Sequence, residues 1–369
     1  MTARLTLKEV QVEALRCHSR TNWVCSPGIN LITGENGCGK TTLLEAVYLM
    51  AHGRSFRQAR DPELVRWGEK KFHIIGKWQR FGPVNIEVLG RRRKTEISVQ
   101  GKLVQRRSDL LETLPVLVDA PHARRVVDGA PNERRHWLDG LIMVCRQSAA
   151  GHYKRYFRSV MQRNRLLRRG VMSSELDAWE HQIVGHGLEI LQERSRMVNE
   201  INACLAEEEL THAGLSLSVQ ITSPDEEAAW LEMLHGQRVE DARMGSLRRG
   251  PHCDRLCIDY LGKEIRSAGS RGQQKLAAMS LKLAEHSIRM RHRNISPVML
   301  MDDCLEALDP GRQHQLLARL EKSEAQVLLT APSGTSLPSD IDIEVYELDA
   351  MRMKSDKIMP THMGAGEVA

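Results

Sequence analysis

Gly34-Glu-Asn-Gly-Cys-Gly-Lys40-Thr41 is the stretch that decides the fold of this chain of 369 residues. It fits the pattern Gly-x-x-x-x-Gly-Lys-[Ser/Thr] of a phosphate-binding loop. The apolar run Ile29 to Thr33 predicts a strand before the loop, and Thr42 to Met50 predicts a helix after it, which Gly53 would end. A strand, a glycine-rich turn and a helix in this order predict a nucleotide-binding domain of the P-loop class.

The residue types in this loop suit a triphosphate. Glycines let the backbone curl so that N–H groups point at phosphate oxygens, beside a helix N-terminus whose dipole favours anions. We expect Lys40 to reach the β and γ phosphates of ATP, and Thr41 to offer its hydroxyl to Mg²⁺. The alternative is a chance match in a glycine-rich turn, and the strand and helix around the loop argue against it. The residues expected to contact the nucleotide here are Gly34, Glu35, Asn36, Gly37, Cys38, Gly39, Lys40, Thr41 and Thr42.

A second motif lies near the C-terminal end, where Pro297-Val-Met-Leu-Met-Asp302-Asp303 predicts an apolar strand that ends in two carboxylates. We expect Asp302 to be a second ligand of Mg²⁺. Asp303 stands where ABC-type ATPases place the residue that polarises the attacking water, so both are candidate catalytic residues. The alternative is a buried strand followed by a capped turn.

Two short motifs complete the pattern of an ABC-type ATPase. Ser270-Arg-Gly272-Gln273 opens a predicted helix that runs to Arg293, and it resembles the Ser-Gly-Gly-Gln signature of that class. Ser270, Gly272 and Gln273 would contact the γ-phosphate of ATP held by the other subunit of a homodimer. Leu308-Asp309 stands where the D-loop is expected. Kinases and GTPases lack this order of motifs.

Beyond these motifs the chain resembles the RecF family, bacterial DNA-repair members of the SMC-like ABC ATPases, over essentially its whole length. The segments that carry the resemblance are Gly53-Arg-Ser-Phe-Arg57, Gly129-x-Pro131-x-x-Arg134-Arg135-x-x-Leu138-Asp139, Gln162-Arg-Asn164 and Gly250-Pro251-His252-x-Asp254.

The resemblance implies an ATP-dependent dimer that binds DNA, single-stranded and duplex, at gaps and junctions. It also implies action with RecO and RecR, help in loading RecA, and a part in replication and the SOS response. The D-loop departs from the family pattern, because Glu306 and Ala307 stand where Ser and Glu are usual. This departure puts the rate of hydrolysis in question.

The order of predicted elements gives the fold class and the domains. Strand-like segments lie at both ends of the chain, and helical periodicity runs from about Leu103 to about Leu210. We therefore expect an α/β protein: an ABC-type P-loop ATPase head, with a mixed sheet and flanking helices, that carries an inserted, mainly helical lobe. The discontinuous ATPase lobe is placed at 1–112 and 212–369, and the helical lobe at 113–211.

A basic segment is the candidate DNA-binding surface. Residues 140–174 contain no acidic residue, and the whole chain has a net charge of +6. Such a cluster binds phosphates without sequence preference, while a solvated helix face is the alternative. Aromatic residues are only 4% of the chain, which argues against a base-stacking platform and favours recognition of the DNA backbone. The arginines expected to contact DNA are Arg158, Arg163, Arg165, Arg168 and Arg169.

Location and enzymatic activity complete the expectations. No apolar run reaches the ~18 residues that a membrane span needs, and the eight scattered cysteines are expected to be reduced thiols in the cytoplasm. Asp303 is one methylene shorter than Glu, so we expect slow turnover. Together with the resemblance to a DNA-repair family, this implies a weak, DNA-dependent ATPase that acts as a switch. The alternatives are an ATP-binding DNA module with negligible hydrolysis, and an ABC-type ATPase subunit of another complex, a transporter included.

Overall fold

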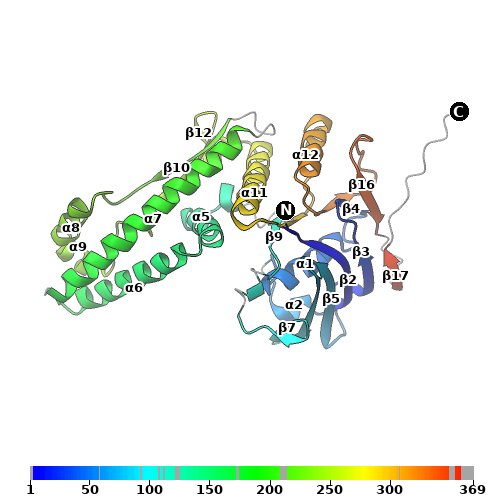
Figure 1. Cartoon of the computed structure of the whole chain (residues 1–369), viewed down its shortest axis with the longest axis horizontal. Helices are drawn as coiled ribbons and strands as arrows, with labels where there is room; N and C mark the ends of the chain where they lie inside the picture. Colours follow the sequence, from blue (N-terminus) through cyan, green and yellow to red (C-terminus); the bar gives the residue numbers. More distant parts are fainter. Residues whose placement is uncertain are drawn as a thin grey trace. The chain divides into compact units, whose positions relative to one another are not determined.

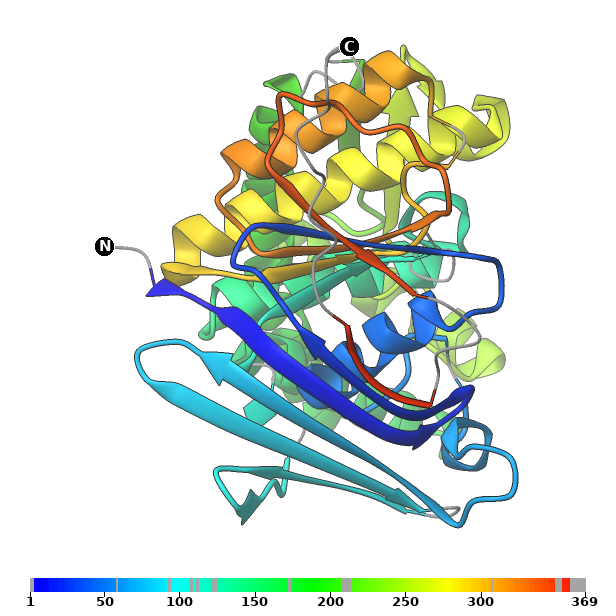
Figure 2. The ribbon, with the colours of Figure 1, turned by 90° about the vertical axis from the view of Figure 1, so that its right-hand side faces the viewer.

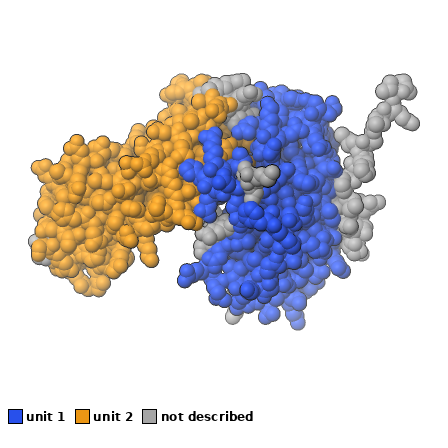
Figure 3. All heavy atoms as spheres, in the orientation of Figure 1, with its two compact units in different colours: residues 1–124, 289–369 blue, residues 125–288 orange. Residues whose placement is uncertain are grey.

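The structure is a computed structural model that describes residues 3–57, 59–91, 94–106, 109–110, 113–120, 125–171, 174–207, 214–306, 308–348 and 354–358. The chain forms two compact units (Figure 3). Unit 1 contains residues 1–124 and 289–369, and unit 2 contains residues 125–288. Unit 1 is therefore discontinuous in sequence, and unit 2 is inserted into it.

Unit 1 is an α/β structure with two large sheets. Its helices are α1 (Lys40–His52), α2 (Asp61–Leu64) and α12 (Pro310–Lys322). Its strands are β1 (Ala3–Arg4), β2 (Thr6–Leu15), β3 (His18–Val24), β4 (Ile29–Gly34), β5 (Lys71–Gln79), β6 (Pro83–Arg91), β7 (Lys94–Val99), β8 (Lys102–Leu103), β9 (Val116–Asp119), β13 (Ile295–Ser296), β14 (Val298–Met301), β15 (Val327–Pro332), β16 (Ile343–Glu347) and β17 (Lys354–Ile358).

The two sheets differ in the direction of their strands. Among the described residues, five strands form a parallel sheet in the order β16-β4-β15-β14-β9. Seven strands form the other sheet, in the order β17-β3-β2-β5-β6-β7-β8, and these pairs are antiparallel except β17 with β3. Together they form the mixed α/β architecture expected of an ABC-type ATPase head.

Helix α1 lies between the two sheets (Figure 2). It contacts β2, β5 and β6 on one side and β4, β9, β14 and β15 on the other. Nearly all its residues are buried, as expected of a helix that is covered on both faces. The predicted helix stop is confirmed, because Gly53 takes a left-handed conformation with φ 63° and its N–H donates to the carbonyl of Leu49 at 2.9 Å.

One segment of unit 1 differs from the sequence-based prediction. The segment Val116–Asp119 was expected to be helical, but it forms β9, whose four residues are all buried and pair in parallel with β14. Three apolar residues followed by an aspartate show neither helical nor alternating periodicity, so only the length of the segment and the preceding Pro115 indicate a buried strand.

Unit 2 is mainly helical (Figure 1). In the described part, a three-stranded sheet in the order β10-β11-β12 accompanies the helices. Its elements are α4 (Arg125–Asp128), α5 (Pro131–Cys145), α6 (Ala149–Arg168), α7 (Ser174–Ala206), β10 (Leu215–Gln220), α8 (Glu227–Gly236), α9 (Arg238–Met244), β11 (Arg255–Tyr260), β12 (Lys263–Glu264), α10 (Ile265–Ala268) and α11 (Arg271–Arg293), which continues into unit 1.

The insertion is longer than the predicted helical lobe at 113–211. Strands β10 and β11 were placed in the ATPase lobe, but they pack with α7 and α5 around one apolar core. Leu215 and Leu217 of β10 share this core with Ile201 and Leu205 of α7. Unit 2 ends at Ile288, which is a member of this core. Strand-like periodicity already resumes near Leu215, so the change of periodicity does not mark the end of the unit.

A buried ion network holds the helices of unit 2 to its sheet. The guanidinium of Arg194, on α7, donates to both carboxylate oxygens of Asp139 at 2.9 Å and to Asp254 at 3.0 Å. Tyr153 donates its hydroxyl to Asp139 at 2.7 Å, and the backbone N–H of Thr222 donates to Asp254 at 2.9 Å. Two of the segments that carry the family resemblance thus meet in the core of unit 2.

We predict that Arg194→Met lowers the free energy of unfolding by about 3–5 kcal/mol, because it leaves two carboxylates buried without their shared cation. Urea unfolding followed by circular dichroism measures the change. Arg196→Met is the matched control: Arg196 lies on the same helix, is exposed and pairs with Glu193, so its loss is expected to cost less than ~1 kcal/mol. Equal unfolding midpoints for the two variants would contradict this account of unit 2.

Candidate nucleotide site

The phosphate loop connects β4 to α1, as its sequence predicts. Gly37 and Gly39 have φ angles of 85° and 105°, in the left-handed region that favours glycine. Gly39 is the N-cap of α1, and no side chain caps this end of the helix. The backbone N–H groups at the start of α1 are therefore placed to bind an anion.

Lys40 lies folded over this loop. Its side chain is buried, and Nζ donates to the carbonyl oxygens of Gly34 at 2.7 Å and Glu35 at 2.9 Å. These acceptors are neutral, and a phosphate oxygen makes a stronger, charge-assisted hydrogen bond with an ammonium group. The ammonium group thus donates to two carbonyl oxygens of the loop, and a triphosphate can replace these neutral acceptors.

The structure brings Thr41 and Asp302 together, although 261 residues separate them in sequence. The hydroxyl of Thr41 donates to Oδ1 of Asp302 at 2.8 Å. Asp302 directly follows β14, whose neighbour β15 lies between it and β4, the strand that leads into the phosphate loop. A hydroxyl and a carboxylate at this distance are hard oxygen ligands of the kind that Mg²⁺ prefers, so these two residues fit the predicted metal site.

Thr330 of β15 is a further member of the site that was not among the site residues expected from the sequence. Its hydroxyl donates to Oδ1 of Asp302 at 2.8 Å and accepts the backbone N–H of Asp303 at 2.9 Å. The same hydroxyl lies 3.4 Å from the carboxylate of Asp303. Thr330 thus links both carboxylates. The available signal was a single polar residue within the apolar strand Val327–Pro332.

Asp303 has a backbone conformation that is unusual for its residue type. Its φ angle is 48°, in the left-handed region, which aspartate visits more readily than most residues. The strand has ended at Met301, so this turn directs the chain away from the sheet directly after the two carboxylates. The hydrogen bond from the Asp303 N–H to Thr330 fixes the turn.

The electrostatics of Asp302 reflect its burial. Burial raises the pKa of its carboxyl above the ordinary value, although the hydroxyls of Thr41 and Thr330 and the charge of Arg57 act in the opposite direction. Arg57 belongs to the segment Gly53-Arg-Ser-Phe-Arg57, and its positive charge therefore acts on the predicted metal ligand.

This arginine segment is held on helix α1. The hydroxyl of Ser55 donates to the buried carboxylate of Glu45 and accepts the backbone N–H of Arg57. Phe56 packs edge-on against Tyr48, with ring centroids 5.5 Å apart. The sequence pattern is thus explained by contacts with α1, which hold Arg57 where its charge acts on Asp302.

The signature motif lies in unit 2. Ser270 precedes α11, its N–H donates to the side chain of Gln273 at 2.8 Å, and its hydroxyl accepts the N–H of Gln273 at 3.3 Å. This reciprocal pair is a capping box, and it fixes the N-terminus of the helix. Ser270 is exposed and Gly272 is half-buried, so this helix end is open to a ligand. In the D-loop, Ala307 lies outside the described residues.

The predicted DNA-binding arginines divide into two groups. Arg158, Arg165, Arg168 and Arg169 are exposed on or next to α6. Arg163 is fully buried and pairs with Glu180 and Asp241, each at 2.8 Å. A guanidinium inside the core cannot reach a phosphate, so the prediction for Arg163 is corrected: this residue joins α6 to α7 and α9.

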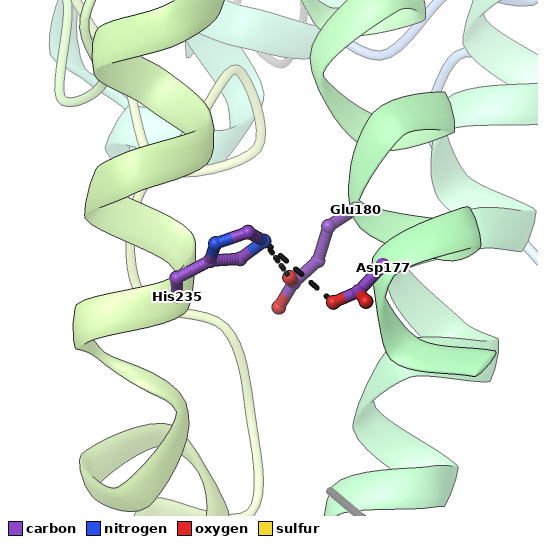
Figure 4. A group of neighbouring side chains, drawn as sticks. All are labelled: Asp177, Glu180 and His235. Atoms are coloured by element: carbon purple, nitrogen blue, oxygen red, sulfur yellow. Dashed lines mark ion pairs between the residues drawn. The ribbon is translucent and has the colours of Figure 1, made fainter. Parts of the chain in front are cut away.

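A nearby group of side chains resembles a metal site but has a different role (Figure 4). Nε2 of His235 lies 3.2 Å from a carboxylate oxygen of Glu180 and 3.7 Å from one of Asp177. Arg238 pairs with both carboxylates, and Arg163 also pairs with Glu180. The arginines already occupy both carboxylates, so we assign the group to ion pairing.

A parallel sheet that presents a phosphate loop, a carboxylate pair and a linking hydroxyl at one edge is the core of a P-loop ATPase. With the antiparallel sheet and the signature turn at Ser270, the fold is that of an ABC-type ATPase head. Comparison with known proteins gives the family. The profile of the RecF/RecN/SMC N terminal domain matches residues 6–339. The chain belongs to the RecF family.

Curated relatives support this assignment. The chain is 34% identical over 323 residues to the DNA replication and repair protein RecF of Heliobacterium modesticaldum, covering 82% of this chain and 86% of the relative. It is 31% identical over 338 residues to the protein of the same name from Moorella thermoacetica, covering 89% and 91%.

Solved structures show the same fold. A structure of the recombination mediator protein RecF with ATP aligns with a TM-score of 0.79 at 24% identity, covering 97% of this chain and 100% of that one. The Smc head domain of Pyrococcus furiosus aligns with a TM-score of 0.61 at 16% identity, covering 97% and 96%. At these identities the likeness establishes the fold alone.

We predict that Asp302→Asn raises the unfolding temperature at pH 7. The pKa of the Asp302 carboxyl is higher in the folded chain than its unfolded value of about 3.9, so ionisation above that pH destabilises the fold. Asparagine keeps an oxygen for the two threonine hydroxyls and removes the charge. The gain is expected to vanish as the pH falls below about 4, where both side chains are neutral. Calorimetric unfolding across pH 4–8 measures it.

Asp340→Asn is the control, and it is expected to change the unfolding temperature at pH 7 in the opposite direction. Its hydrogen bond with His314 lowers the pKa of the exposed Asp340 carboxyl, so this carboxylate adds stability above its unfolded pKa, and the variant loses that contribution at pH 7. An Asp302→Asn variant that unfolds at a lower temperature than the parent at pH 7 would contradict the assignment of Asp302 as a destabilising buried charge.

Proposed function

We propose that the chain is an ATP-dependent DNA-binding protein of recombinational repair that works as a switch. The observation that carries this proposal is the arrangement of Lys40 and Thr41 at the phosphate loop, with Thr41 bonded to Asp302 and the hydroxyl of Thr330 linking Asp302 to Asp303. This set supplies a triphosphate with cationic, metal-binding and carboxylate groups. The exposed turn at Ser270 in unit 2 supplies a second helix N-terminus for the γ-phosphate.

Each residue of unit 1 has a defined role in this proposal. Lys40 and the N–H groups of the loop bind the phosphates of ATP, and Thr41 and Asp302 hold Mg²⁺, which supplies neutralisation of phosphate charge. Asp303 accepts a hydrogen bond from the attacking water, and the bond from its N–H to Thr330 keeps its carboxylate in place. Because the aspartate side chain is short, the reaction is expected to be slow, as in a timer.

The signature motif is the reason for proposing a homodimer. Ser270, Gly272 and Gln273 of one copy would close on the γ-phosphate held by the loop of the other copy. The capping box uses the side chains of Ser270 and Gln273 to fix the turn, so the binding group is a preformed end of α11. ATP binding would then bring the copies together, and hydrolysis would let them separate.

The names of the relatives support a role in DNA repair and replication, and one solved structure is described as a recombination mediator of the RecFOR pathway. For this chain, gap and junction binding, the partners RecO and RecR, RecA loading, the SOS response and a cytoplasmic location follow from the family resemblance and belong to the proposal. No helix among the described residues has the length and apolar character to cross a membrane.

The proposed DNA surface is the exposed face of α6. It carries Arg158, Arg165 and Arg168, and Arg169 follows directly after the helix. Arg168 donates to the backbone carbonyl of Asn164 at 3.1 Å, which leaves its other N–H groups for a phosphate. Contacts of this kind bind DNA of any sequence and weaken steeply with salt.

A binding module with negligible hydrolysis is the second candidate, because the D-loop holds Glu306 where the family usually has serine. Asp303→Asn separates the two functions. In a hydrolysing switch this variant accumulates the ATP-bound form, whereas in a pure binding module it behaves like the parent. The third reading, a subunit of another ABC-type complex, is disfavoured by the family assignment.

We predict that Arg165→Ala weakens binding to a gapped duplex in the presence of ATP. The plot of the logarithm of the association constant against the logarithm of the salt concentration is expected to become less steep by about 1, since one phosphate contact is lost. Titration of a fluorescent gapped duplex at several salt concentrations measures the slope. Arg243→Ala is the control, because the exposed Arg243 of α9 already pairs with Glu240. If the gapped duplex does not bind at all, or binds with equal slopes in parent and Arg165→Ala, then α6 is not the DNA surface.

A further inference from the structure

A histidine outside the recognised motifs touches the phosphate loop. His18 is the first residue of β3, and the hairpin formed by β2 and β3 places its ring against the last glycine of the loop. The side chain is fully buried. One ring nitrogen, Nε2, lies 3.1 Å from the carbonyl oxygen of Gly39, and the other, Nδ1, lies 2.9 Å from the hydroxyl of Thr21.

The partners determine which ring nitrogen carries the proton. A carbonyl oxygen can only accept, so Nε2 must bear the hydrogen and donate it to Gly39. Nδ1 is then the acceptor, and the hydroxyl of Thr21 donates to it. Burial lowers the pKa of His18, which favours this neutral form. Both polar atoms of the ring are thus used, one of them on the loop itself.

The contact with the loop is close. A Cβ atom on Gly39 would lie 2.5 Å from Nε2 of His18 and 2.7 Å from Sγ of Cys17. The φ angle of 105° at Gly39 also excludes most side chains. The ring therefore contacts the loop where the chain enters α1, and the same carbonyl accepts the N–H groups of Thr42 and Leu43 in the first turn of that helix.

The hairpin that carries His18 is itself fixed to α1. Arg16, in the turn of the hairpin, makes two hydrogen bonds to the buried carboxylate of Glu45, at 2.6 and 3.0 Å. Its backbone N–H also donates to the backbone carbonyl of Leu64, and the guanidinium of Arg66 donates to the backbone carbonyl of Cys17. All these residues belong to unit 1, so the hairpin, the loop and α1 form one connected set of contacts.

We infer that His18 is a positioning residue of the nucleotide site, which holds the Gly39 peptide so that the N–H groups at the start of α1 face the α and β phosphates. The inference rests on the proposed ATP binding and adds a residue that no phosphate-loop pattern contains. A simpler reading makes His18 a core residue whose only role is stability, and the two readings predict different results for matched variants.

The experiment measures the dissociation constants of Mg·ATP and Mg·ADP with the full-length chain, together with its unfolding temperature. His18→Phe keeps the ring and removes both nitrogens. It is expected to weaken ATP and ADP alike by roughly two- to tenfold, the range of one hydrogen bond of ordinary net strength. His18→Gln keeps an N–H donor at the reach of Nε2 and is expected to bind both nucleotides within about twofold of the parent.

Val12→Ala is the stability control, because Val12 is buried on the same hairpin in strand β2. It is expected to lower the unfolding temperature and to leave both dissociation constants unchanged. The inference is overturned if Val12→Ala weakens nucleotide binding as much as His18→Phe, if His18→Phe binds like the parent, or if His18→Gln fails to restore binding. A parent protein that binds neither nucleotide would instead overturn the proposed function, and this inference with it.

Discussion

The hydrogen bond between Thr41 and Asp302 is the interaction on which the nucleotide site depends. It joins the first turn of α1 to the end of β14, two elements far apart in sequence. The bond forms because β4, β15 and β14 are parallel neighbours, and the carboxyl ends of parallel strands meet at one edge of a sheet. The lysine, the hydroxyls and the carboxylates come together only when this strand order is correct.

The same sheet explains why the site contains buried charge. Asp302 accepts two threonine hydroxyls, yet burial still raises the pKa of its carboxyl, so the fold carries a desolvated group that it does not need for stability. Unit 2 uses buried charge differently, since Arg163 and Arg194 are each matched by two carboxylates. A buried carboxylate without a paired arginine therefore lies at the candidate site, and arginine–carboxylate pairs lie in the structural core.

Much of this architecture could be predicted from the sequence. The phosphate loop, the strand before Asp302 and the helix after Ser270 combine a local motif with clear periodicity, and the structure contains all three elements. Strand β9 could not be predicted because four buried residues show no period. The boundary at Ile288 depends on which core β10 joins, and that is a tertiary choice.

Side-chain roles show the same division between local and tertiary information. Arg163 resembles its exposed neighbours in sequence, and only the position of Glu180 and Asp241 reveals that it is buried. The contacts of Thr330 with Asp302 and of His18 with Gly39 are made across elements, so no local motif predicts them. Pattern reading therefore finds the residues that chemistry requires, and it misses those that hold them in place.

We propose that a second copy of the chain completes the nucleotide site, through the turn at Ser270. Sedimentation velocity with Mg²⁺ and a non-hydrolysable ATP analogue tests it most directly. We expect the parent protein to double its mass with the analogue. A Ser270→Arg variant is expected to bind the analogue but to keep the mass of one chain. The control is Ser216→Arg, altered at an exposed position of β10, and it is expected to dimerise like the parent. A parent that binds the analogue and remains a single chain at high concentration would contradict the proposal.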